Sequence, residues 1–108
     1  VLATAGVPEA RRLYAKVLRG QGAACFRLGH YAEAEALLGE STRIFRALNL
    51  PIETAFSLNQ LAATLHLEGR YPEARRSLEE SLQLSQAEAG RWLYPYSLND
   101  LGAALHAL

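Results

Sequence analysis

The chain has 108 residues, of which 11 are Lys or Arg and 11 are Asp or Glu, so its formal net charge is zero. A chain without net charge has no broad field to hold nucleic acid or an anionic membrane surface, and we expect neither as a partner. Half of the residues are hydrophobic and few are aromatic, a composition that favours helices over strands. The sequence therefore predicts a single all-α domain with one core.

Cys25 is the only cysteine, which excludes an internal disulfide and a zinc site built from cysteines. Its helical spacing favours a buried thiol over a nucleophile. No apolar run reaches the roughly 20 residues that span a bilayer, and Val1–Val7 lacks the charged start and apolar core of a signal peptide. The expected location is the cytoplasm.

The first predicted helix runs from Pro8 to Leu28, since proline suits a first helical position and the apolar residues that follow have helical spacing. Gly29 and His30 end it. A second helix is expected from Tyr31 to Leu48, where one stripe faces the core. The stripe consists of Ala34, Leu37, Leu38, Ser41, Ile44 and Phe45.

A second helix pair follows the turn at Asn49–Pro51. Its first helix is expected from Ile52 to Glu68, and its second from Pro72 to about Ala87. The turn at Gly69–Arg70 between them resembles the turn of the first pair.

Gly90 is expected to end the second pair, and Pro95 then lies in the first turn of a fifth helix that continues to Leu108. Val1–Ala5 reads as the tail of a preceding helix, so we expect the chain to be a section of a longer array. The fifth helix would then end without a covering partner. Its apolar edge, consisting of Leu101, Leu105 and Leu108, predicts self-association into a homo-oligomer.

The chain repeats itself at an offset of 40 positions. The matching pairs are Gly29 and Gly69, Tyr31 and Tyr71, Ala34 and Ala74, Ser41 and Ser81, Leu58 and Leu98, Asn59 and Asn99, and His66 and His106. We divide the domain into residues 8–48, 49–89 and 90–108, the last being the first helix of a third repeat, with 1–7 as a tail or leader. A period of this size is typical of stacked units that present one long shared surface.

The features that recur from unit to unit in this chain resemble the tetratricopeptide repeat. They are a small residue in the first helix (Gly22, Ala62, Gly102), Gly followed by Tyr at the turn, and Ala in the second helix. The resemblance implies a right-handed α-solenoid of antiparallel helix pairs, here with about five helices. The unit is longer than the usual length of about 34 residues, and Ser57–Ala63 and Leu78–Leu82 resemble the long repeats of kinesin light chains and of bacterial transcription regulators and signalling ATPases.

In such arrays the first helix of each pair lines a concave groove. Side chains spaced by three, four and three residues share that face. They are Lys16, Arg19, Phe26, Phe56, Asn59, His66, Tyr96, Asn99 and His106. The neighbouring stripe is expected to be buried, and consists of Leu18, Cys25, Leu58, Leu61, Leu65, Leu98, Leu101 and Leu105.

Asn59 and Asn99 are the strongest candidates for binding, because a carboxamide can both donate to and accept from a peptide backbone. Phe56 and Tyr96 can hold an apolar side chain, and Lys16, Arg19 and Arg27 can attract a carboxylate. The alternative is that the asparagines only solvate a helix face or bond a neighbouring helix. The chain lacks the full Lys and Asn set with which some co-chaperones hold a carboxylate tail.

We predict no catalytic residue, no metal ligand and no cofactor. His66 and His106 lie in different repeats, without the near spacing of a metal pair on one helix. The sequence also contains no Gly-rich phosphate loop and no nucleophile elbow, so an enzyme is not expected. The predicted function is a protein-interaction module that binds a peptide or helix, as the sensor or scaffold arm of a larger bacterial regulator. The alternative is a structural spacer or self-assembly module with no groove ligand.

Overall fold

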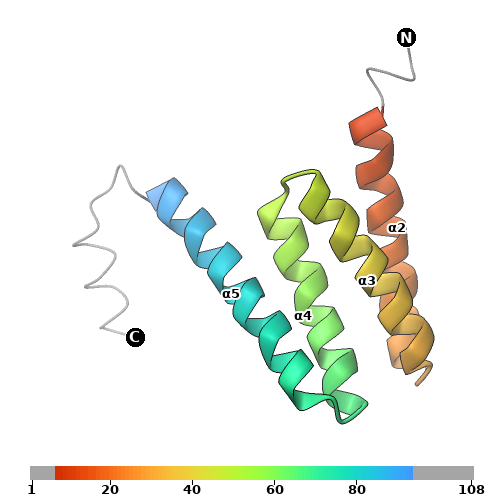
Figure 1. The fold of residues 1–108 in the computed structure, drawn as a ribbon. Helices are drawn as coiled ribbons and strands as arrows, with labels where there is room; N and C mark the ends of the chain where they lie inside the picture. Colours follow the sequence, from red (N-terminus) through yellow and green to blue (C-terminus); the bar gives the residue numbers. More distant parts are fainter. Residues whose placement is uncertain (1–6, 94–108) are drawn as a thin grey trace.

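The computed structural model describes residues 7–93, and these form four α-helices: α2 (Val7–Arg27), α3 (Tyr31–Ala47), α4 (Pro51–Leu67) and α5 (Tyr71–Leu93). Figure 1 shows the helices following one another across the molecule in chain order, with each antiparallel to the next. The part of the chain described here contains no strand. The all-α fold of packed helix pairs predicted from the sequence is confirmed.

Three short turns, at residues 28–30, 48–50 and 68–70, produce the antiparallel arrangement. Each contains one residue with positive φ: Gly29 (83°), Asn49 (57°) and Gly69 (79°). The amide of that residue donates to the carbonyl three positions earlier, and the next amide donates to the carbonyl five positions earlier. These two bonds satisfy the last carbonyls of the helix and reverse the chain.

Asn49 is the one non-glycine residue with positive φ in residues 7–93. Asparagine tolerates this conformation, whereas alanine at a left-handed position costs about 1 kcal/mol. We expect Asn49→Ala to lower the free energy of unfolding by about that amount, and Asn49→Gly to change it by less than about 0.5 kcal/mol. Urea unfolding followed by circular dichroism measures both. Equal losses in the two variants would show that the Asn49 side chain, rather than its backbone conformation, stabilises the turn.

The core lies between the helices, along the stripes predicted from the sequence. Leu18, Leu58 and Leu65 are buried, as expected. The wholly buried Phe45 packs with Ala15, Leu18 and Ile44 in a cluster that joins α2 to α3. A smaller cluster of Ala62, Leu65 and Ala74 joins α4 to α5.

Cys25 and Leu61 were expected in the core but are only half-buried. Cys25 lies near the C-terminal end of α2, where its thiol points toward Glu33 of α3, 3.9 Å from the carboxylate. Leu61 lines a shallow hollow between α3 and α5. Both residues have core spacing, but each lies at an edge of its helix contact, where the neighbouring helix no longer covers it.

Two buried serines tie each second helix to the helix before it. The Ser41 hydroxyl donates to the Ala15 carbonyl oxygen at 2.8 Å, and the Ser81 hydroxyl contacts the Ala55 carbonyl oxygen at 3.0 Å. Ser41 also lies 3.2 Å from the hydroxyl of Ser57 on α4. Since a buried hydroxyl without a partner is costly, these bonds explain how serine can occupy a core position.

The helices form two layers, because α2 and α4 neighbour each other through Arg19 and Glu53 (3.6 Å), and α3 and α5 through Arg46 and Glu80 (2.8 Å). The thinnest dimension of the Cα trace, 19 Å, has room for two layers of helices whose axes lie about 8–10 Å apart. First helices of the pairs therefore share one face, and second helices share the other.

The prediction that α5 ends before Gly90 is wrong, since α5 continues through Gly90 to Leu93. A glycine inside a helix costs only about 1 kcal/mol, which is too little to end a helix unless the chain also turns there. The expected fifth helix, its edge at Leu101, Leu105 and Leu108, and residues 1–6 of the expected tail lie outside the described residues. Val7, the last residue of that tail, belongs to α2 instead.

Candidate functional site

A hollow of about 390 Å³ lies on the face where α2 and α4 are neighbours, bordered by α5. Its lining is mostly apolar and consists of Phe26, Asn59, Ala62, Ala63, His66, Leu67, Ala74 and Leu78. A smaller hollow of about 210 Å³ adjoins it and shares two of these residues. It is lined by Ala23, Phe26, Arg27, Gln60 and Ala63. We call the two hollows together the α2–α4 groove.

Helical spacing brings these side chains together. Asn59, Ala63 and His66 follow one another by four and three positions along α4, so they lie in one row. The structure places Asn59 and His66 in the same hollow as Phe26, which belongs to the same row on α2. These three residues come from the predicted groove set, and their role in binding stays a prediction.

A tyrosine at each of two turns contacts the ring of a groove residue. The ring of Phe26 lies 5.9 Å from that of Tyr31, and the ring of His66 lies 5.0 Å from that of Tyr71 in an edge-to-face arrangement. Sequence reasoning treated the two tyrosines only as markers of the repeat. At both turns the tyrosine follows a groove residue by five positions. This repeated spacing could have indicated the contact from the sequence.

Asn59 bonds the neighbouring helix, as one of the two alternatives proposed. The Ser81 hydroxyl donates to Asn59 Oδ1 at 2.7 Å and lies 3.0 Å from the Ala55 carbonyl oxygen. A hydroxyl has one hydrogen, so these acceptors compete for it. If Ser81 donates to Ala55 and the amide turns over, Asn59 Nδ2 donates to Ser81 instead. In either orientation, one end of the Asn59 amide bonds Ser81 of α5. The other end is available to a ligand, as a donor when it is the nitrogen and as an acceptor when it is the oxygen.

Arg19 differs most from its expected role as a free cation. Its guanidinium lies 5.2 Å from the centre of the Phe45 ring and 4.6 Å from that of Phe56, and one nitrogen is 3.6 Å from Glu53. These contacts place the guanidinium against side chains of α3 and α4. Arg19 therefore links the two helix pairs. Lys16 is half-buried and Phe56 is exposed, and neither lines the α2–α4 groove.

Three residues of the predicted groove set, Tyr96, Asn99 and His106, lie outside the described residues.

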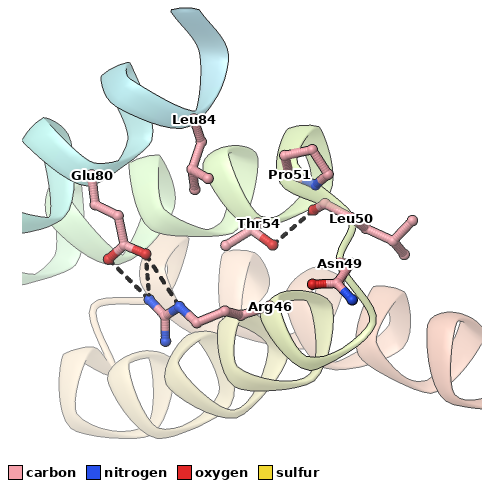
Figure 2. Close-up of a pocket in the computed structure, with 7 residues that line it drawn as sticks. All are labelled: Arg46, Asn49, Leu50, Pro51, Thr54, Glu80 and Leu84. Carbon is pink, nitrogen blue, oxygen red and sulfur yellow. Dashed lines mark hydrogen bonds and ion pairs between the residues drawn. The ribbon is translucent and has the colours of Figure 1, made fainter. Parts of the chain in front are cut away.

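Another hollow, of about 460 Å³, lies where α3, α4 and α5 meet (Figure 2). Arg46 of α3 donates to both carboxylate oxygens of Glu80 on α5, at 2.9 and 2.8 Å, and Figure 2 shows this pair closing one side. Asn49, Leu50, Pro51, Thr54 and Leu84 complete the lining. Sequence reasoning missed this hollow. Arg46 and Glu80 are 34 positions apart, so no local spacing rule relates them.

A cluster of charged residues surrounds Arg70, in the turn between α4 and α5. Its guanidinium donates to Glu35 of α3 at 2.6 Å and to Glu73 at 3.0 Å, and lies 3.7 Å from Glu68. The hydrogen bond from Arg70 lowers the pKa of Glu73. Burial raises the pKa of Glu68, and the adjacent Glu35 carboxyl raises it further.

These opposite pKa shifts predict opposite effects of removing the two charges. The raised pKa of Glu68 means that its ionisation costs stability at neutral pH, and this cost is absent below the unfolded-state pKa of about 4.3. The lowered pKa of Glu73 means that its charge stabilises at neutral pH, and this gain is lost as the pH falls through the folded-state pKa. We expect Glu68→Gln to raise the melting temperature at pH 7 and Glu73→Gln to lower it, with both differences vanishing in acid. Melting curves recorded from pH 7 down to below the unfolded-state pKa test both variants. Shifts of the same sign at pH 7 would contradict the opposite pKa shifts of Glu68 and Glu73.

Within residues 7–93, no group of three or more His, Cys, Asp or Glu side chains is arranged to hold a metal ion. None of the four described helices combines the length and hydrophobicity that a bilayer crossing requires.

The family model described as tetratricopeptide repeat matches residues 54–91. This stretch contains most of α4 and α5, and with them Asn59, His66 and Leu78 of the α2–α4 groove. No curated protein and no solved structure matched the chain significantly.

Proposed function

Because residues 54–91 form a tetratricopeptide repeat, a unit that generally mediates contacts between proteins, we propose that the α2–α4 groove binds a peptide or helix of a protein partner. The observation that carries this proposal is the lining of the larger hollow. It combines mostly apolar side chains with two polar ones, Asn59 and His66, which lie in one row along α4. Such a combination of apolar surface and a few placed polar groups is typical of ligand sites.

The lining indicates the chemistry of the ligand. An apolar side chain of the partner fits against Phe26, Leu67 and Leu78 and removes their surface from water. The free end of the Asn59 amide then bonds the partner backbone, which requires no particular partner sequence. Arg27, at the smaller hollow, is the basic residue placed to meet a carboxylate. Arg19 does not serve this purpose, since Glu53 and two aromatic rings already engage it.

A displayed peptide library tests this function. We expect the chain to select peptides with an apolar anchor residue, and Ala63→Glu to weaken their binding at least tenfold, or about 1.4 kcal/mol. Ala63 is exposed in the groove, so a glutamate there places bulk and charge in the hollow without disturbing the core. Ala36→Glu is the matched control, because Ala36 is exposed on α3 and lines neither hollow. Failure to select any peptide, or equal loss in both variants, would favour a structural spacer with no groove ligand.

We further infer that the module is the sensor or scaffold arm of a larger regulatory protein of the bacterial cytoplasm. This inference rests on the repeat offset of 40 residues and on the phrases at Ser57–Ala63 and Leu78–Leu82, which resemble those of long-repeat regulators. The full-length coding sequence is the test. A DNA-binding or ATPase domain in the same chain would support the proposal, and a chain of repeats alone would contradict it.

A further inference from the structure

The charges of the chain balance overall but are unevenly distributed. The helix α2 carries five of the 11 basic residues and one of the 11 acidic residues, so positive charge is in excess there. In α3, α4 and α5 acidic residues outnumber basic ones. Residues outside 7–93 do not change this distribution, because 1–6 have no charged side chain and 94–108 have one acidic residue, Asp100.

Most of the basic residues of α2 form one row along the helix. They are Arg12, Lys16, Arg19 and Arg27. The row faces the second pair of helices, since Arg19 contacts Glu53 and Phe56 of α4. Arg27 lines the smaller hollow of the α2–α4 groove. Forty positions later, the corresponding residues of α4 are uncharged, and they are Ile52, Phe56, Asn59 and Leu67. The groove therefore has a basic wall on α2 and a mostly apolar wall on α4.

Two cations of this row are left without a carboxylate. Arg12 and Arg19 each form an ion pair, at 3.7 and 3.6 Å. Within residues 7–93, Lys16 and Arg27 form no ion pair. Lys16 also lies four positions from Arg12 and three from Arg19, and like charges at this spacing on a helix repel each other. Its charge therefore costs helix stability, and its use is better explained by a partner than by the fold.

The distance between the two unpaired cations bears on the shape of that partner. Lys16 and Arg27 are 11 positions apart on α2, which corresponds to about 16 Å at the rise of an α-helix. In a partner helix, residues at the same spacing lie the same distance apart and on one face, because they are about three turns apart. An extended chain covers about 16 Å in roughly five residues, and an odd spacing turns the two side chains to opposite faces. A helix therefore presents both carboxylates to α2, whereas an extended segment does not.

Given the groove function proposed above, on which this inference rests, we propose that the partner segment is an amphipathic helix with an acidic stripe. Two of its carboxylates meet Lys16 and Arg27. Its apolar side faces α4 and places a side chain in the hollow at Phe26 and Ala63, as is typical of a helix bound in a groove. Nucleic acid fits this surface less well, because such sites neutralise many phosphates together and the other three described helices carry an excess of negative charge.

A displayed library of random peptides long enough to form four or five helical turns tests the proposal on the whole chain. We expect the selected peptides to carry acidic residues 11 positions apart, matching Lys16 and Arg27, beside an apolar stripe. Synthetic copies should gain helical circular dichroism when they bind. Changing these two acidic residues to glutamine should weaken binding by about three- to tenfold, the effect of losing two exposed charge pairs.

Charge reversal on the protein provides the complementary measurement, by fluorescence anisotropy of a labelled selected peptide. Lys16→Glu and Arg27→Glu together should weaken binding by about tenfold or more, because each replaces an attraction with a repulsion. Arg11→Glu is the matched control, since it reverses a charge of the same helix outside the row, and we expect a change of less than about twofold. Circular dichroism of the free variants confirms that each remains helical.

The outcomes separate this proposal from the groove function. Peptides with an apolar anchor but no acidic stripe, weakened by Ala63→Glu and not by the charge reversals, would overturn the acidic helix and keep the groove. Acidic peptides that bind without gaining helical structure would also overturn it. Tighter binding of a random-sequence DNA or RNA oligonucleotide, weakened by the same reversals, would reassign the cations to nucleic acid. Failure to select any peptide would overturn both the acidic helix and the groove function.

Discussion

Replacing Phe45 by alanine should lower the free energy of unfolding by about 3–5 kcal/mol, the usual range for removing a buried phenylalanine. Phe45 is wholly buried and packs against Ala15, Leu18 and Ile44, so it joins the first helix pair. Its ring also lies beneath the guanidinium of Arg19. The substitution leaves a cavity that neighbouring side chains cannot fill without moving a helix. Denaturant unfolding followed by circular dichroism measures the loss.

Phe56→Ala is the matched control, because the rings of Phe45 and Phe56 both flank Arg19 but only the Phe45 ring is buried. Phe56 is half exposed on α4, 4.6 Å from the guanidinium. We expect its removal to cost less than about 1 kcal/mol, consisting of part of a cation–π contact and little lost burial. If Phe45→Ala does not fold, Phe45→Leu keeps most of the volume and should remain measurable. Similar losses at the two positions would contradict the assignment of Phe45 to the core.

Gly22→Ala should destabilise the protein by about 1–3 kcal/mol, the range expected for overpacking a core. A Cβ atom at this position would lie 2.7 Å from Cγ and 2.9 Å from Cδ2 of Leu38, which is itself wholly buried. The close approach of α2 to α3 therefore depends on the missing side chain. In the second repeat Ala62 occupies the same position, and there Leu78, the counterpart of Leu38, is half exposed.

Gly20→Ala provides the control, two residues away in the same helix. Apart from its chain neighbours and the backbone of its own helix, nothing lies within 4 Å of a Cβ built at Gly20, so alanine there gains helix propensity without a clash. We expect Gly20→Ala to stabilise by about 0.5–1 kcal/mol. Thermal unfolding should therefore shift upward for Gly20→Ala and downward for Gly22→Ala. Shifts of the same sign would mean that the two helices adjust freely, and that the contact with Leu38 does not set their distance.

Local interactions decided what could be predicted about the helices. Apolar residues at helical spacing, with Gly29 and Gly69 able to adopt positive φ, located the first four helices to within one residue at most ends. The exception was the C-terminal end of α5, predicted near Ala87 and found at Leu93. Glycine permits a turn but does not require one, so Gly90 alone could not indicate where this helix ends.

The sequence by itself determined the repeat, the helix pairs, most of the buried stripes and the row of residues that includes Asn59 and His66. These depend on spacing along one helix, which the order of residues specifies directly. Contacts between helices depend on residues far apart in the chain, and only the tertiary structure decided them. It brought Ser81 to Asn59 and placed Arg19 between Phe45 and Phe56.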